Sequence, residues 1–175
     1  MNMSLSYPLG HFTPQEQPTA EQRAGWIEDI AALPADLKRT VAEFTPEQLR
    51  IPYRPGGWST QQVVHHLADN DMNAYIRFKR ALTEESPLAG SYREDLWAEL
   101  ADYEETPIVF SLQLLESLRH RFVILLRTLP AEQFQRCFTS PTHGAMTLEQ
   151  ATQRFAWHGR HHLAQISSLK QRLNG

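Results

Sequence analysis

The chain is poor in sulfur and has no long apolar run, and each shortage argues against a class of protein. Cys137 is the only cysteine among 175 residues, which excludes an intrachain disulfide and argues against a thiolate metal cluster. The longest uninterrupted apolar run, residues 122–126, is far too short for a transmembrane helix. The first ten residues lack the basic and apolar regions of a signal peptide. We therefore expect a cytoplasmic protein without a membrane partner, in which imidazole nitrogens or oxygens would hold any metal.

An excess of charge of either sign is also lacking. The chain has 17 basic and 20 acidic residues, a formal net charge of −3, and no cluster of Lys or Arg that could follow a phosphate backbone. We therefore expect no nucleic-acid partner. The chain is 41% hydrophobic, which is enough for a core, and its length predicts a single domain over residues 1–175.

Alternating apolar runs flanked by hairpin turns are lacking as well, so no strand is predicted. Ser/Thr-x-x-Gln capping boxes at 19–22, 59–62 and 147–150 predict helices over about 20–44, 59–82 and 147–173. A fourth long helix is predicted from Thr106-Pro107 to about residue 129, and Pro34 is expected to kink the first helix or split it. A short helix is expected within 92–100. With residues 1–18 as an irregular arm, the pattern predicts an all-α four-helix bundle.

Three of the eight histidines fall in WHGRHHLAQI, residues 157–166. Each helical residue turns by about 100°, so positions four apart share a face. His158 and His162 fall within or beside the apolar stripe of the last helix, whereas Trp157 and His161 point away from it. The segment therefore predicts an inward His-x-x-x-His pair and an outward histidine.

The second helix presents adjacent histidines that the same test separates. His66 borders the apolar stripe, and His65 lies far round the helix from it. Asn70, Asn73 and Arg77 follow His66 at spacings of four, seven and eleven, which predicts a polar seam facing another helix. The seam could form hydrogen bonds between helices or contact a substrate, and the spacing leaves both open.

Two imidazoles one turn apart can supply two ligands to a metal, and a third from a facing helix completes a set that leaves one position open. The same spacing also fits hydrogen-bonded core histidines, or histidines near the surface at the end of the bundle, so spacing alone does not decide. His11, His120 and His143 have no partner at such a spacing and are expected to be surface or capping residues.

Three segments of the chain resemble the DinB/YfiT-like family of metal-dependent hydrolases. They are SLSYPLG (4–10), YRPGGWSTQQVVHHLADNDMNAYIRFKRALTEE (53–85) and FAWHGRHHLAQI (155–166), and GGWS-x-x-x-VVHHLAD is specific to the family. The resemblance implies a dimeric four-helix bundle with one divalent metal on three histidines. His66, immediately before LAD, matches the first ligand, and His158 and His162 match the other two.

Three functions are therefore expected. The first is a hydrolase in which Zn²⁺, or alternatively Ni²⁺, activates water against a small-molecule substrate, with no catalytic base assigned. Asn70, Asn73 and Arg77 are its expected substrate contacts. The second, implied by other members of the wider superfamily, is a transferase that joins a bacillithiol-type thiol to an electrophile. The third is a non-catalytic metal-binding dimer, although a structural zinc site usually has four protein ligands and the sequence offers three.

Overall fold

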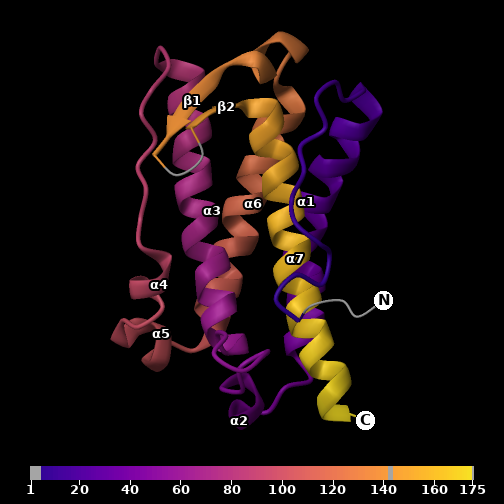
Figure 1. Cartoon of the computed structure of the whole chain (residues 1–175), viewed down its shortest axis with the longest axis vertical. Helices are drawn as coiled ribbons and strands as arrows, with labels where there is room; N and C mark the ends of the chain where they lie inside the picture. Colours follow the sequence, from indigo (N-terminus) through magenta and orange to yellow (C-terminus); the bar gives the residue numbers. More distant parts are fainter. Residues whose placement is uncertain (1–4, 142–143, 175) are drawn as a thin grey trace.

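Four long helices dominate the computed structural model, which describes residues 5–141 and 144–174 (Figure 1). They are α1 (Ala20–Val41), α3 (Thr60–Thr83), α6 (Ile108–Thr128) and α7 (Leu148–Asn174). Shorter elements join them: α2 (Pro46–Leu49), α4 (Glu94–Trp97), α5 (Ala101–Glu105), the 3-10 helix η1 (Ala131–Gln135), β1 (Cys137–Ser140) and β2 (Gly144–Thr147). The predicted all-α four-helix bundle is confirmed.

The predicted capping boxes begin three of the long helices. Ser59 Oγ accepts a hydrogen bond from the Gln62 backbone N–H, and the Gln62 side chain accepts one from Ser59 N–H. The same reciprocal pair begins α1 at Thr19 and α7 at Thr147. These bonds satisfy backbone donors that have no partner within the helix, which is why the starts of these helices could be read from four-residue motifs.

Pro34 lies inside α1, which remains one helix, so the predicted alternative of two helices is wrong. Proline has no N–H, which leaves the carbonyl of Ile30, four residues earlier, without its helical donor. Arg119 of α6 supplies one instead, with Nη1 3.0 Å from Ile30 O. A tertiary hydrogen bond thus replaces the bond that proline removes, and a local sequence pattern could not reveal it.

The four helices form a ring in which each contacts two neighbours. The neighbouring pairs are α1 with α7, α7 with α3, α3 with α6, and α6 with α1. The first half of α1 packs at the same level as the first half of α7 and the second halves of α3 and α6. Helices α1 and α7 therefore run in one direction and α3 and α6 in the other (Figure 1).

The apolar core is divided into two clusters along the bundle axis. One contains Ile30, Phe78, Phe122 and Phe155, and the other contains Leu33, Leu37, Val64, Leu67, Leu115 and Ile166. Three buried polar side chains lie between the clusters in the sequences of their helices: Asp71 on α3, Arg119 on α6 and His162 on α7. His66, also buried, lies at the edge of this level, next to Leu67 of the second cluster. We call this level, together with His158, the polar layer.

A small antiparallel hairpin corrects the prediction that no strand is present. Cys137 pairs with Thr147 and Ser140 with Gly144, at the end of the bundle where α7 begins (Figure 1). Each strand has only four residues, too few for alternation to stand out from the neighbouring loop. The hairpin adds Phe138 to the apolar cluster that contains Phe78 and Phe155.

The N-terminal arm, predicted as irregular, lies along α7. Gln153, which is buried, accepts from Gln15 N at 2.8 Å and donates to Gln15 O at 3.0 Å. Gln165 donates to Ser6 O at 2.9 Å. The arm therefore covers a face of α7 that a helical wheel places in solvent. Within the described residues, no helix is long and apolar enough to cross a membrane.

Candidate metal centre

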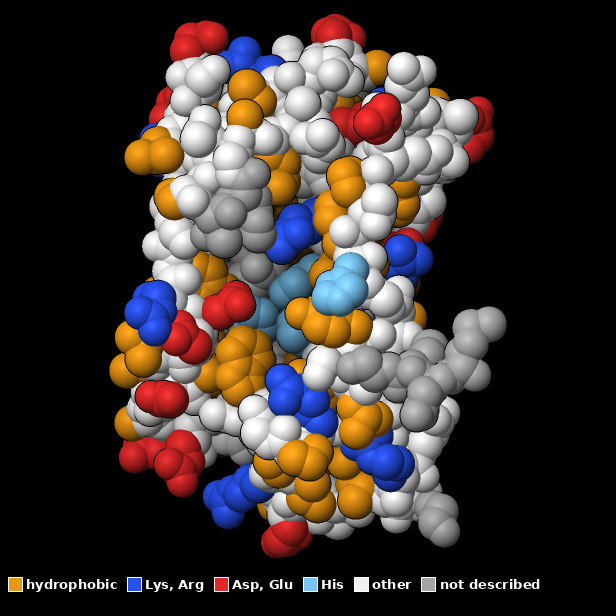
Figure 2. All heavy atoms as spheres, in the orientation of Figure 1, with side chains coloured by type: hydrophobic (Ala, Val, Ile, Leu, Met, Phe, Trp, Pro, Cys, Tyr) orange, Lys and Arg blue, Asp and Glu red, His pale blue; other side chains and the backbone are white. Residues whose placement is uncertain are grey.

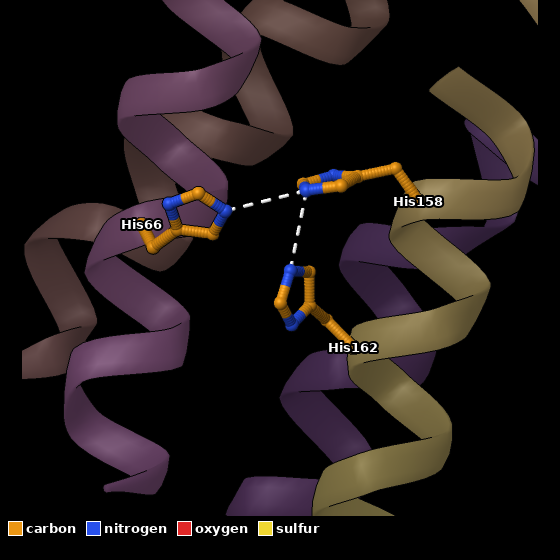
Figure 3. Close-up of side chains that lie close together, drawn as sticks. All are labelled: His66, His158 and His162. Atoms are coloured by element: carbon orange, nitrogen blue, oxygen red, sulfur yellow. Dashed lines mark hydrogen bonds between the residues drawn. The ribbon is translucent and has the colours of Figure 1, made fainter. Parts of the chain in front are cut away.

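Three histidines from two helices meet in the polar layer (Figure 3). His66 extends from α3, and His158 and His162 extend from successive turns of α7 toward it. His158 Nε2 lies 3.2 Å from His66 Nε2 and 3.2 Å from His162 Nε2. One ring nitrogen from each residue lies within 4.8 Å of the others. The structure thus brings together the three residues that the sequence selected.

Burial keeps these imidazoles neutral. Burial lowers the pKa of His66 to about 4 and the pKa values of His158 and His162 well below the usual value. Each neighbouring imidazole lowers the pKa of His158 further, because protonating two rings at this distance would place like charges in contact. Neutral imidazole is the form of histidine that binds a divalent ion.

The nitrogen spacing fits a shared cation better than hydrogen bonding alone. A neutral imidazole carries a single N–H, and two unprotonated nitrogens in contact repel each other. Tetrahedral bonds of about 2.0 Å from Zn²⁺ would hold ligand nitrogens about 3.3 Å apart, close to the two observed separations. His66 Nδ1 is buried without a hydrogen-bond partner among the described atoms, so no neighbour holds its ring for another purpose.

Two amide side chains contact the far nitrogens of the α7 pair. His162 Nδ1 lies 2.9 Å from Gln165 Oε1, an acceptor only, so Nδ1 carries the proton and Nε2 keeps a free lone pair. The amide nitrogen of Asn70, Nδ2, lies 3.4 Å from His158 Nδ1, and a half-turn of the amide would bring the oxygen to this position. With its oxygen turned to this nitrogen, Asn70 would fix the same tautomer in His158. Such partners orient ligands and raise metal affinity.

Trp58 covers the cluster at the end of α3. Its ring lies 4.7 Å from the ring of His66 and is stacked at 6.4 Å on that of His162. Gly56 has φ +66°, and a Cβ on Gly57 would lie 2.8 Å from Arg54 Cγ. The two glycines therefore permit the tight turn that places Trp58 directly before the α3 cap.

A buried ion pair lies in the same polar layer. Arg119 Nε donates to Asp71 Oδ2 at 2.5 Å, and both side chains are almost fully buried. Gly159, next to His158, packs against this arginine: a Cβ there would lie 2.7 Å from Leu33 Cδ2 and 3.1 Å from Arg119 Nη2. Glycine therefore allows α7 to approach α1 and α6 closely beside the histidines.

A cavity of about 330 Å³ begins at His158 and extends toward the hairpin. Its apolar side chains include Phe78 and Phe155, and its polar side chains include Asn70, Arg77 and Arg154. The other lining residues are Ala74, Ser91, Tyr92, Glu94, Asp95, Phe138, Ser140, Met146, Ala151 and His158. In Figure 2 the histidines (pale blue) lie in a hollow bordered by basic, acidic and apolar side chains. A small molecule in this cavity would contact the cluster through His158.

The predicted polar seam is only partly assembled at this cavity. Asn70 and Arg77 line it, whereas Asn73 lines a separate, smaller cavity of about 180 Å³ that also includes Arg77. Asn73 Nδ2 donates to Asp69 O of its own helix at 2.9 Å. The structure therefore brings Asn70 and Arg77, but not Asn73, into the cavity beside His158.

The three side chains predicted to point away from the apolar stripes of α3 and α7 are covered by other parts of the chain and are buried or half-buried instead of exposed to solvent. His65 is buried, with Nδ1 2.7 Å from Ser111 Oγ of α6, because α6 and the ring of Tyr103 cover that side of α3. His161 is also buried and accepts a hydrogen bond from Gln165 Nε2, and Trp157, stacked on it, is half-buried. The N-terminal arm covers this face of α7.

Two of the remaining histidines, His11 and His120, are not part of the cluster. His11 and His120 are exposed, as expected of surface residues, and His143 lies outside the described residues.

Gln165, Trp58, Arg154 and Tyr92 are site residues that the sequence analysis did not select. Gln165 is three residues after His162, and Arg154 is four residues before His158. Helical spacing could therefore have placed both on the face of the histidine pair. Tyr92 carries no such signal, since it belongs to an irregular segment that only the tertiary structure places at the cavity.

Comparisons with known proteins agree with this architecture. The family model of the DinB superfamily matches residues 29–166. "Putative metal-dependent hydrolase YfiT" of Bacillus subtilis (strain 168) is 46% identical over 173 residues, which cover 98% of this chain and 97% of YfiT. A Bacillus cereus (strain AH820) protein, also named a metal-dependent hydrolase with the qualifier "putative", is 46% identical over 170 residues, 97% of this chain and 98% of its own.

A solved structure extends the similarity to three dimensions. It is described as "YfiT from Bacillus subtilis is a probable metal-dependent hydrolase with an unusual four-helix bundle topology". The two chains are 47% identical, with a TM-score of 0.94, over 97% of this chain and 98% of the other.

Proposed function

This chain belongs to the DinB superfamily, and on that premise we propose that it is a metal-dependent hydrolase whose ion is held by His66, His158 and His162. The observation that carries the proposal is the convergence of three neutral imidazoles, with 3.2 Å between neighbouring nitrogens, at the end of a cavity. The names of the relatives supply the reaction class, and the cavity indicates a small-molecule substrate.

The donor set favours Zn²⁺, with Ni²⁺ as the alternative, since imidazole suits both ions and availability decides between them. Bound at an open three-nitrogen site, such an ion supplies Lewis-acid activation of water near neutral pH. The cluster contains three metal-ligating side chains among the described residues, fewer than the four that usually close a structural zinc site. This count supports a catalytic rather than a structural role.

The surrounding residues have separate tasks in this proposal. Gln165 holds the proton on His162 Nδ1, so Nε2 faces the cluster as a lone pair. Trp58 excludes solvent on the side away from the cavity. Substrate enters along the cavity and reaches the cluster at His158, with Asn70 and Arg77 as contacts along its path.

Metal content of single variants tests the assignment. His66→Ala, His158→Ala and His162→Ala should each lose stoichiometric metal, because two imidazoles bind a divalent ion much more weakly than three. His65→Ala and His161→Ala are matched controls, each removing a buried histidine beside a proposed ligand, and should keep it. Elemental analysis of the purified proteins, with circular dichroism to confirm folding, measures this. Stoichiometric metal in any of the first three variants would refute the ligand set.

The thiol-transferase alternative uses the same three histidines, so only activity separates it from hydrolysis. Metal-loaded protein should cleave members of an ester and amide panel. Conjugation of bacillithiol to a model electrophile, without any cleavage in that panel, would favour the transferase. Coordination by a fourth protein side chain, with no turnover in either assay, would favour the non-catalytic bundle.

We also propose that the chain forms a homodimer, as the family resemblance implies. Large apolar side chains on α6 are solvent-exposed, including Val109, Phe110 and Leu114. Light scattering should give twice the mass of one chain, and the mass of a single chain would contradict the dimer.

A further inference from the structure

Two arginines from different helices line the cavity that begins at His158. Arg77 comes from α3, and Arg154 lies on α7 one turn before His158. The walls beside them also carry apolar side chains, which include Phe78 and Phe155. Burial lowers the pKa of both guanidinium groups, so water solvates these cations less well than at an open surface.

Two donors of the cavity lining, Arg77 Nε and the Tyr92 hydroxyl, lack acceptors among the described atoms. Arg77 Nη2 donates to Gly90 O at 2.8 Å, but Arg77 Nε is buried with no hydrogen-bond partner among the described atoms. The hydroxyl of Tyr92 is also buried with no hydrogen-bond partner among the described atoms. Burial raises the pKa of this hydroxyl, so it stays protonated and can donate a hydrogen bond. A buried donor without an acceptor is unfavourable, and a ligand that brings acceptor oxygens would remove this cost.

The acidic residues of the lining do not cancel this preference. Asp95 is held by Arg93, whose Nη2 lies 2.5 Å from Asp95 Oδ2. Glu94 is mainly solvent-exposed, and burial of part of its carboxyl group raises its pKa. Glu94 attracts both lining arginines electrostatically, but it makes no hydrogen bond to Arg77 Nε, so this donor still lacks an acceptor.

We propose that Arg77 and Arg154, together with Tyr92, bind the carboxylate of a small substrate whose reactive bond lies at the histidine cluster. Guanidinium groups present paired N–H donors that match a carboxylate. Arg154 is four residues from His158, so the two groups originate about 6 Å apart along the helix. The apolar walls would hold a short hydrocarbon body between the carboxylate and the reactive bond. This inference names the substrate class of the proposed hydrolase and rests on that function.

Binding by the unaltered, metal-free protein is the first test, because removing the metal excludes direct coordination of the probe. Isothermal titration calorimetry should show 3-phenylpropionate binding about tenfold or more tightly than its neutral amide, 3-phenylpropionamide. Equal affinities would overturn the proposal. Phenyl phosphate is the second arm, and tighter binding of the phosphate than of the carboxylate would overturn the choice of carboxylate.

Variants then assign the site. Arg77→Gln and Arg154→Gln should each weaken 3-phenylpropionate binding about tenfold and leave amide binding and metal content unchanged. Arg80→Gln on α3 and Arg160→Gln on α7 are matched controls, since both arginines lie outside this cavity and pair with other carboxylates. Unchanged carboxylate binding in both cavity variants would overturn the proposal. The comparison of probes on the unaltered protein stands even if a variant fails to fold.

The two proposals fail in distinguishable ways. Carboxylate preference in the metal-free protein, with no hydrolysis by the metal-loaded protein, would refute the hydrolase and leave the carboxylate site. Hydrolysis of neutral and anionic esters at equal rates, with no carboxylate preference in binding, would refute the carboxylate site and leave the hydrolase.

Discussion

Gln165 should control metal affinity although it is not a proposed ligand. Its Oε1 accepts from His162 Nδ1 at 2.9 Å, which fixes the tautomer that presents Nε2 to the cluster. Gln165→Leu keeps a similar side-chain volume but removes this acceptor. Loss of such an outer partner typically lowers metal affinity 10- to 100-fold, or about 1.4–2.8 kcal/mol. Competition with a chromophoric chelator measures the affinity.

The second contact of Gln165 requires a control. Its Nε2 also donates to Ser6 O of the arm and to His161 Nε2, so Gln165→Leu loosens the arm as well. Gln153 is buried on the same helix and bonds the arm at Gln15 without contacting the histidine cluster. Gln153→Leu should therefore lower stability and leave metal affinity near that of the unaltered protein.

Gln165→Glu separates the two contacts further. A carboxylate still accepts from His162 Nδ1 but cannot donate to Ser6 or His161, so metal affinity should be kept while the arm is weakened. Wild-type affinity in Gln165→Leu, or an equal loss in Gln153→Leu, would refute the reasoning.

Three further predictions concern the polar layer. Asp71→Ala should lower the free energy of unfolding by about 3–5 kcal/mol in urea titrations, because it leaves the Arg119 charge buried and unpaired, and a loss below 1 kcal/mol would contradict this. Gly159→Ala should destabilise the folded protein by about 1–3 kcal/mol, because the added Cβ overpacks the contact with Leu33 and Arg119. Gly25→Ala, which has no atom near its Cβ position, should be neutral or stabilising, and the reverse order of the two stabilities would contradict the close packing. Metal-free protein should lose stability as the pH falls from 6.5 to about 4, because the unfolded chain protonates its histidines over this range while burial holds the pKa of His66 at about 4. His66 alone should lower the free energy of unfolding by about 3 kcal/mol, and a urea midpoint that does not change over this pH range would contradict the prediction.

The parts of the fold that local chemistry determines were predictable from the sequence. Capping boxes mark the starts of α1, α3 and α7 because the bonds that stop backbone fraying are made within four residues. The inward direction of His158 and His162 follows from helical geometry and the apolar stripe of α7. The residues that the sequence selected for the metal centre therefore converge in the structure.

Features that depend on contacts distant in sequence were not predictable. A helical wheel assumes that the face opposite the core is in solvent, but α6 covers His65 and the N-terminal arm covers His161. The continuity of α1 through Pro34 depends on an arginine 85 positions later. The spacing that aligned Asn73 with Asn70 and Arg77 holds along the helix edge, but only the tertiary structure shows where the cavity ends.

The ion pair between Asp71 and Arg119 explains how the polar layer keeps its position between two apolar clusters. Apolar contacts are non-directional and tolerate a sliding helix, whereas hydrogen bonds to a buried guanidinium do not. Arg119 joins α6 to α3 through Asp71 and to α1 through Ile30 O, and Gly159 of α7 packs against it beside His158. One side chain thus contacts all three other long helices at the level of the histidines. Buried ion pairs contribute little net stability, so its main effect is to hold α1, α3 and α6 at one relative height, at which Gly159 packs α7 against the guanidinium. That height decides whether nitrogens from the two helices meet at 3.2 Å, and the two apolar clusters supply the stability that allows a polar layer between them.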